Sequence, residues 1–287
     1  MKKSVAALCL SMTVFGTVGL FKRFIPVSAG ELALYRAVLA AIVLGLFLLL
    51  TKNPVPYRSI KKQLPLLLLT GAVMGFNWIL LFKAYDYTTV SIATLSYSFA
   101  PVLVTVACPF LFRERLNFRQ VLCFAVSTVG LVLITGIDTT GNSHLTGVLF
   151  GLAAAILYAS VVLLNKYIQG VGGIHRTYLQ FLAAIVVLVP YVALTGGADF
   201  SRMDATGLAC LLVLGSVHTG ITYCLYFSSI SKLPGQQVAI LSYIDPLVAV
   251  LCSVFILHEP MSGLQWLGGG LILGATALSQ LLGDNKV

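Results

Sequence analysis

The sequence predicts an all-α integral membrane protein of ten transmembrane helices, arranged as two inverted-topology repeats of five helices each. Three observations lead to this fold class. The chain is poor in charged residues, it contains ten apolar runs separated by short polar segments, and its second half repeats the first in register. Together they leave no stretch long enough for a separate soluble domain.

The composition indicates a lipid-facing surface. Of the 287 residues, 59% are hydrophobic and 9% are charged, whereas a soluble domain carries about 25% charged residues. We therefore expect the lipid bilayer of the cell membrane to surround the protein. No basic stripe with interleaved aromatic residues occurs, so the net charge of +9 predicts membrane orientation and no nucleic-acid partner.

The apolar runs define the predicted helices, since a bilayer core about 30 Å thick needs roughly 20 apolar residues per span. The first five spans are 4–21, 30–50, 64–84, 88–111 and 117–136. The second five are 147–166, 175–195, 206–228, 234–257 and 261–281. Segments rich in turn-forming residues, such as 53–56 and 170–173, separate them.

The first run also has features of a secretory signal peptide, because Lys2 and Lys3 precede it and small residues occupy 27–29. Lys22 and Arg23 interrupt the approach to that cleavage site, and further apolar runs follow. We expect the run to be retained as the first helix.

Lys and Arg in the short loops predict that both termini are cytoplasmic. In that orientation the outer side holds four: Lys22, Arg23, Lys83 and Arg202. The cytoplasmic side holds thirteen: Lys2, Lys3, Lys52, Arg58, Lys61, Lys62, Arg113, Arg115, Arg119, Lys166, Arg176, Lys232 and Lys286.

No pattern indicates a metal, a cofactor or a nucleotide. All six cysteines (Cys9, Cys108, Cys123, Cys210, Cys224 and Cys252) lie in apolar runs without metal-type spacing, which predicts buried thiols and no disulfide. The phosphate-binding motifs GxGxxG and GxxxxGK[ST] and the hydrolase motifs HExxH and GxSxG are absent from the sequence. ATP-driven transport by this chain alone is thereby excluded.

The repeat is visible when residues 66–133 are shifted by 145 positions onto 211–278. Pro101 then falls on Pro246 and Glu114 on Glu259, which apolar composition alone does not explain. The predicted units are 1–141 and 142–287, within one transmembrane domain. Five helices per unit make the second unit enter the membrane in the opposite sense, an arrangement typical of transporters with a site near the bilayer midplane.

Two segments resemble a known family: Phe76-Asn77-Trp78 leading to Ser96-Tyr97-Ser98-Phe99-Ala100-Pro101, and Leu241-Ser242-Tyr243-Ile244-Asp245-Pro246. The chain is similar over its length to the drug/metabolite transporter superfamily, in its ten-helix EamA-like branch. The resemblance implies a central cavity and secondary transport, often export, of amino acids and other small metabolites. It also implies an acidic residue before the second proline, here Asp245. Pro260 after Glu259 departs from the first copy, which has Arg115.

Asp245 is the leading candidate for a substrate-binding residue. It is predicted near the middle of the ninth span, where a carboxylate costs about 2.5–3.5 kcal/mol and must face water or a partner. Pro246 is expected to free the carbonyl of Ser242, and small and polar residues share this helix face with Asp245. Asp245 carries a proton or anchors a substrate cation; a structural ion pair is the alternative.

Arg36 is the second candidate, with three alternatives: it snorkels to the interface, pairs with Glu31, or binds a substrate carboxylate. His218 is a proton relay or a buried histidine held by a hydroxyl group. Four further residues of the candidate binding site line a pocket or serve helix packing: Asn77, Trp78, Tyr97 and Tyr158. Ser242, on the face of Asp245, completes the eight predicted binding residues.

Other charges are expected to be structural. Glu114 and Glu259 each precede a helix, whose free amide groups they are expected to receive. Lys83 and Asp86 are expected to form an exposed pair of little energy.

These features predict a monomeric secondary transporter of small amphipathic metabolites. Export is favoured over import, and amino acids are the leading substrate class. A proton is the candidate coupling ion. Export of drugs or organic cations is an alternative within the same class. The alternatives of other classes are an intramembrane enzyme using His218 and Asp245 as an acid–base pair, and a membrane receptor without transport.

Overall fold

The computed structural model describes residues 2–55, 60–112, 118–135, 142–196, 203–230, 233 and 241–283. Within these ranges the secondary structure is helical, without strands. The helices of the predicted first half are α1 (Lys2–Gly16), α2 (Val18–Lys22), α3 (Ala29–Leu50), α5 (Leu64–Tyr87), α6 (Val90–Tyr97), α7 (Ala100–Phe112) and α8 (Phe118–Thr135).

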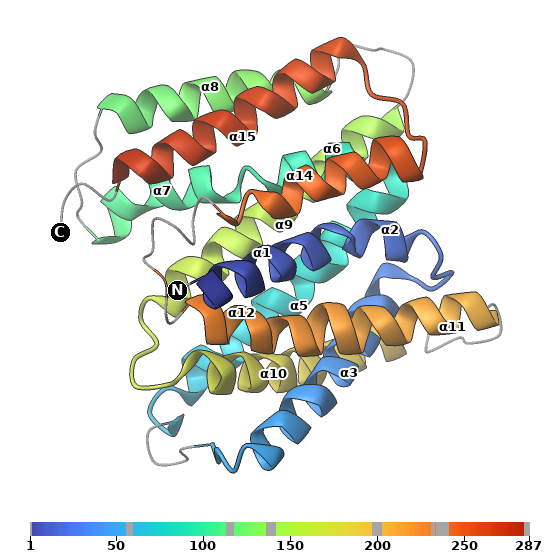
Figure 1. Ribbon diagram of the computed structural model, residues 1–287, viewed down its shortest axis with the longest axis vertical. Coiled ribbons are helices and arrows are strands. Elements are labelled where there is room, and N and C mark those ends of the chain that lie inside the picture. Colours follow the sequence, from blue (N-terminus) through green and yellow to red (C-terminus); the bar gives the residue numbers. More distant parts are fainter. Residues whose placement is uncertain are drawn as a thin grey trace.

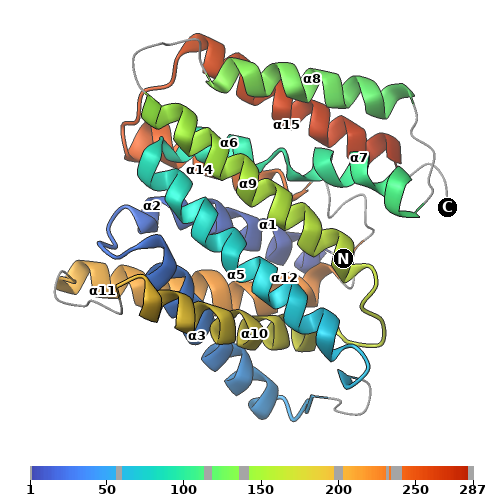
Figure 2. The ribbon, with the colours of Figure 1, turned by 180° about the vertical axis from the view of Figure 1, so that it is seen from behind.

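The predicted second half contains α9 (Asn142–Asn165), α10 (Gly173–Leu194), α11 (Ala205–Leu212), α12 (Thr222–Ile230), α14 (Ile244–Leu251) and α15 (Gly263–Gly283). Two π-helical stretches, η1 (Val213–Ile221) and η2 (Cys252–Ile256), continue α11 and α14. Figures 1 and 2 show α8 and α15 side by side at one end of the molecule, with α3, α10 and α11 at the opposite end.

Six helical segments among the described residues are long and apolar enough to cross a membrane: Lys2–Lys22, Ala29–Leu50, Leu64–Tyr87, His144–Asn165, Gly173–Leu194 and Ala205–Ser229. Val90–Val104, Val121–Ile134 and Ile244–Ile256 are shorter apolar helices. Large apolar side chains face outward, with Leu50 83% and Leu194 87% exposed. Such a surface is stable in lipid but not in water.

Four of the predicted spans are not continuous α-helices: η1 interrupts the eighth, and the first, fourth and ninth are broken. Thr17 separates α1 from α2, and Ser98 and Phe99 separate α6 from α7. In the predicted ninth span, the described residues form a turn at Ser242 and Tyr243 before α14 begins. The last two breaks have the same cause, because Pro101 and Pro246 lie in the first turn of α7 and α14, where a missing N–H is tolerated.

The prediction that Asp245 lies in mid-helix is therefore wrong. Asp245 is the second residue of α14, in its first turn, because the chain cannot continue a regular helix through the segment just before Pro246. A carboxylate in a first turn also receives the favourable field of the helix dipole.

Close packing joins the two predicted halves. The core includes Ala37 and Ala40 of α3, Phe82 of α5 and Phe181 of α10. The backbones of α8 and α15 touch at Gly130 and Gly268, where an added Cβ on either residue would collide with the carbonyl oxygen of the other. Small residues permit this approach in membrane helices, where lipid supplies no hydrophobic force between them.

Candidate functional site

The broken helices border a central cavity of about 270 Å³. Its walls are mainly aromatic and polar, with one acidic and one basic side chain. The lining residues are Met12, Phe15, Val18, Arg36, Trp78, Leu81, Tyr85, Thr94, Tyr97, Ser98, Ala100, Pro101, Tyr158, Tyr223, Tyr226, Ser242, Tyr243, Asp245 and Pro246. Helices from both predicted halves thus surround one small-molecule-sized space.

Asp245 supplies the acidic group of the cavity. Its side chain is partly accessible because it faces the cavity. An unpaired charge in a dry interior would be too costly in free energy. Within the part of the chain that the structure describes, no hydrogen bond or ion pair engages its carboxylate. The carboxylate is therefore free to bind a cation or a proton.

Arg36 supplies the basic group from α3, where it is 5% exposed. Its Nε donates a 2.7 Å hydrogen bond to Oγ1 of Thr219, and its guanidinium carbon lies 4.6 Å from the ring centroid of Trp78. A cation over the face of an indole is attracted by the ring quadrupole. Arg36 therefore does not snorkel to the membrane interface.

Arg36 does not pair with Glu31 either. Glu31 accepts a 2.9 Å bond from the Ser28 backbone N–H, while Ser28 Oγ accepts from the Glu31 N–H, so the two residues form a capping box at the start of α3. Arg36 and Asp245 also form no direct ion pair, although both line the cavity. One positive and one negative group thus face the same space without neutralising each other by contact.

Tyrosines form most of the aromatic wall. The ring of Tyr97 lies 5.4 Å from that of Tyr158, and Tyr223 lies 5.1 Å from Phe15. The Tyr85 hydroxyl is 3.3 Å from Oγ1 of Thr94. Such rings offer apolar faces to a ligand and polar tips for hydrogen bonds.

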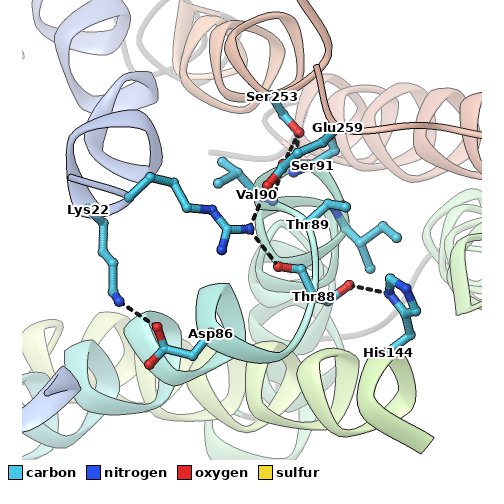
Figure 3. Close-up of polar contacts among 11 residues, drawn as sticks. Lys22, Asp86, Thr88, Thr89, Val90, Ser91, His144, Ser253 and Glu259 are labelled. Atoms are coloured by element: carbon cyan, nitrogen blue, oxygen red, sulfur yellow. Dashed lines mark hydrogen bonds and ion pairs between the residues drawn. The ribbon is translucent and has the colours of Figure 1, made fainter. Parts of the chain in front are cut away.

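A second group of residues joined by polar contacts, here called the polar cluster, links α2, α5 and α6 to the turn before α15 (Figure 3). Its members are Lys22, Arg23, Asp86, Thr88, Val90, His144, Ser253 and Glu259. Arg23 donates to Oε1 of Glu259 at 2.5 Å and to the carbonyl of Thr88 at 3.1 Å. Oε2 of Glu259 accepts from the Val90 N–H at 2.7 Å and from Oγ of Ser253 at 2.5 Å. One carboxylate therefore binds three separate segments.

Two sequence predictions about these charges need correction. Glu259 precedes α15, but its carboxylate caps the N-terminus of α6, because the turn at His258, with φ of 54°, directs the chain toward α6. Asp86 pairs with Lys22 rather than Lys83, whose Nζ lies 5.6 Å from the Phe150 ring. Glu114 lies outside the described residues.

The lining of the cavity is deeply buried beside the polar cluster. Tyr85 lies about one turn from Thr88, and Thr94 lies about one turn from Val90. The side chains of Tyr85 and Thr94 are 5% and 6% exposed. Tyr158, about 21 Å along α9 from the cluster residue His144, is 42% exposed. From this difference in burial we infer that the polar cluster seals one end of the cavity and that the Tyr158 end is the more open.

Comparison with known proteins decides the family. The model of the EamA-like transporter family matches residues 2–136 and, a second time, residues 145–281. The chain belongs to the EamA-like transporter family. It is a multi-pass membrane transporter.

Proteins of known sequence or structure resemble this EamA-like transporter over most of their length. The uncharacterized transporter YxxF of Bacillus subtilis (strain 168) is 32% identical over 99% of this chain and 91% of its own. The probable amino-acid metabolite efflux pump of Escherichia coli (strain K12) is 26% identical over 80% and 81%. A protein of known crystal structure shares the fold, with a TM-score of 0.69 over 98% of both chains at 17% identity.

The structure of this EamA-like transporter brings six of the eight predicted site residues into the cavity: Asp245, Arg36, Trp78, Tyr97, Tyr158 and Ser242. The other two do not line it. Asn77 Nδ2 donates to the Ala154 carbonyl at 2.6 Å and so joins α5 to α9. His218 Nε2 lies 2.8 Å from Oγ1 of Thr17, and its ring contacts Phe21.

Sequence reasoning missed four cavity tyrosines: Tyr85, Tyr223, Tyr226 and Tyr243. A signal existed, because tyrosine in membrane helices concentrates at the two interfaces. Tyr223 and Tyr226 lie one turn apart in α12, within a predicted span, where their hydroxyl groups require a polar surrounding.

Proposed function

We propose that this EamA-like transporter is a secondary active exporter of small amphipathic metabolites, amino acids foremost, and that it works by alternating access to the central cavity. One observation carries the proposal: Asp245 and Arg36 line the same cavity without forming an ion pair. An amino acid carries an ammonium for the first and a carboxylate for the second, so both charges of the ligand would be matched.

The remaining architecture supports the same mechanism. The cavity lies where the broken segments before α7 and α14 meet, and broken helices near the midplane form substrate sites in transporters built from inverted repeats. The family model matching each half once supports a duplicated chain of ten helices. A single chain then supplies both halves, so we propose a monomer with both termini cytoplasmic.

The printed name of the Escherichia coli relative, a probable amino-acid metabolite efflux pump, supports this substrate class and this direction of transport. The tyrosine-rich wall favours a second candidate class, organic cations, because aromatic faces and one carboxylate bind cations without needing Arg36.

A matched set of ligands distinguishes the two classes: phenylalanine, its decarboxylated amine phenethylamine, and its deaminated acid 3-phenylpropionate. With purified protein, we expect phenylalanine to raise the unfolding temperature most, since a ligand of the folded state stabilises it. Equal stabilisation by phenethylamine would favour the organic-cation class. If no amino acid and no amine moved against its gradient in proteoliposomes, secondary active transport would be refuted.

A further inference from the structure

We propose that Thr219 is the positioning residue that holds the Arg36 guanidinium in the orientation required to bind a substrate carboxylate. This inference rests on the proposed function, in which Arg36 is the carboxylate anchor. The bond to Thr219 keeps one edge of the guanidinium available for a ligand carboxylate, and this determines which ligands the cavity selects.

The argument starts from the π-helical stretch η1. In an α-helix a threonine hydroxyl donates to the carbonyl three or four residues earlier. In η1 the Thr219 hydroxyl donates instead to the Leu214 carbonyl, five residues earlier, at 3.0 Å. Its hydrogen is thus committed to its own helix, and its oxygen is left to accept the bond from Arg36 Nε at 2.7 Å.

Two glycines allow η1 to lie against α3 closely enough for this contact. A Cβ at Gly215 would collide with Leu39, and one at Gly220 would collide with Val43. Thr219 is 0% exposed, so no water replaces its bond to the guanidinium. π-type turns within α-helices often occur at functional sites, and here the π-helical pitch directs the Thr219 hydroxyl oxygen toward Arg36.

The geometry leaves a specific part of Arg36 unoccupied. A guanidinium has five N–H donors, one on Nε and four on the two terminal nitrogens. Among the described residues Nε has a partner, Thr219, and the terminal nitrogens have none. Trp78 covers one face of the group, with its ring centroid 4.6 Å away. The terminal edge remains for a two-pronged bond to a carboxylate.

Without the Thr219 bond, the guanidinium would be free to rotate about its stem and present Nε or a single terminal nitrogen. A ligand with a carboxylate would lose its paired hydrogen bonds, whereas an amine held by Asp245 would not. The measurable consequence is a change in selectivity between an amino acid and its decarboxylated amine.

Thr219→Val removes the hydroxyl at nearly constant shape. We expect it to weaken phenylalanine binding on the order of tenfold, the worth of one hydrogen bond to a charged group, and to change phenethylamine binding less than twofold. Thr219→Ser retains the hydroxyl and should restore the ratio of the two affinities.

Thr222→Val is the matched control. Thr222 is 2% exposed and donates to the Val217 carbonyl at 2.7 Å, again five residues earlier, but it has no bond to Arg36. This variant should lower the unfolding temperature less than Thr219→Val, which also leaves Arg36 Nε without its acceptor, and it should leave the ratio of affinities unchanged.

The outcomes separate this inference from the proposed function. If Arg36→Gln abolishes the preference for phenylalanine but Thr219→Val does not, the positioning role is refuted and the carboxylate anchor stands. If Thr219→Val weakens the binding of both ligands equally, or gives the same ratio of phenylalanine to phenethylamine affinity as Thr222→Val, then Thr219 has only a structural role. If Arg36→Gln leaves the preference intact, both proposals fall.

Discussion

Replacing Glu259 by glutamine should loosen the seal at one end of the cavity. The carboxylate accepts from Arg23 at 2.5 Å, from the Val90 N–H at 2.7 Å and from Ser253 at 2.5 Å. Glutamine has a similar size, but it keeps only one acceptor oxygen and places an NH2 donor where the other accepted, so the change removes the charge and part of these bonds. If the cavity opens alternately to the two sides, these bonds must break in the other state.

The size of the effect follows from the exposure of the pair. A hydrogen bond to a charged group contributes about 1.5–3 kcal/mol, and the 33% exposed side chain of Arg23 reduces this by solvent screening. We expect the closed state to lose about 1–2 kcal/mol relative to the open state, which is roughly a 5- to 30-fold change in their ratio.

Thiol labelling measures this ratio. A cysteine at position 94, introduced in a variant without native cysteines, lies behind the seal, because Thr94 lines the cavity and is 6% exposed. A membrane-impermeant maleimide added from the side of the polar cluster should react roughly 5- to 30-fold faster in Glu259→Gln. Labelling from each side in oriented vesicles makes the result independent of the predicted topology.

Asp86→Asn is the control, since it removes a charge from the same cluster, where Asp86 pairs with Lys22 and is 42% exposed. Solvent around Asp86 screens its pair with the buried Lys22, whereas Glu259 is less exposed and accepts three bonds, so Asp86→Asn should accelerate labelling less than Glu259→Gln does. Equal acceleration in both variants, or none in Glu259→Gln, would show that the Glu259 bonds do not hold the cavity closed.

Three further predictions concern the site, the packing and the topology. Asp245→Asn should abolish concentrative transport in proteoliposomes with little change in unfolding temperature, because it leaves no buried partner unpaired; a fully active variant would contradict this. Gly268→Leu should destabilise the protein by about 1–3 kcal/mol in thermal unfolding, through collision with Gly130, whereas Gly270→Leu should not, because a Cβ added at Gly270 has no atom within 4 Å. Cysteines at 142 and 169 should be labelled from opposite sides of the membrane, 142 from outside; labelling from one side would refute the inverted repeat.

The membrane class and the family follow from residue types and their spacing. Low charge, apolar runs and the repeated Pro and Glu positions are local or periodic features, and they need no knowledge of contacts. Asp245 was likewise recognisable, because a carboxylate in an apolar run is costly wherever the run packs. Its place within the helix was predicted wrongly, although Pro246 was the visible cause of the break.

The partners of the charged residues depended on the tertiary structure. Glu259 caps a helix 169 residues away, and Arg36 meets Thr219 across 183 residues. Sequence spacing identifies only near neighbours, so it offered Glu31 as the one side-chain partner of Arg36 within the protein, among three alternatives, and the following helix for Glu259. In a membrane interior the partner is whichever polar group the packing brings within reach, since water is not available as an alternative.

The pocket and the orientation of its basic group also depended on packing. The cavity tyrosines come from α5, α6, α9 and α12 and from the turn before α14, and no spacing rule indicates that they converge. The π-helical stretch Val213–Ile221 has the same apolar pattern as an α-helix over so short a length. The hydroxyl of Thr219 therefore acquires its partner only once η1 and α3 are in contact, because the direction of one side chain depends on a helical pitch that tertiary packing selects.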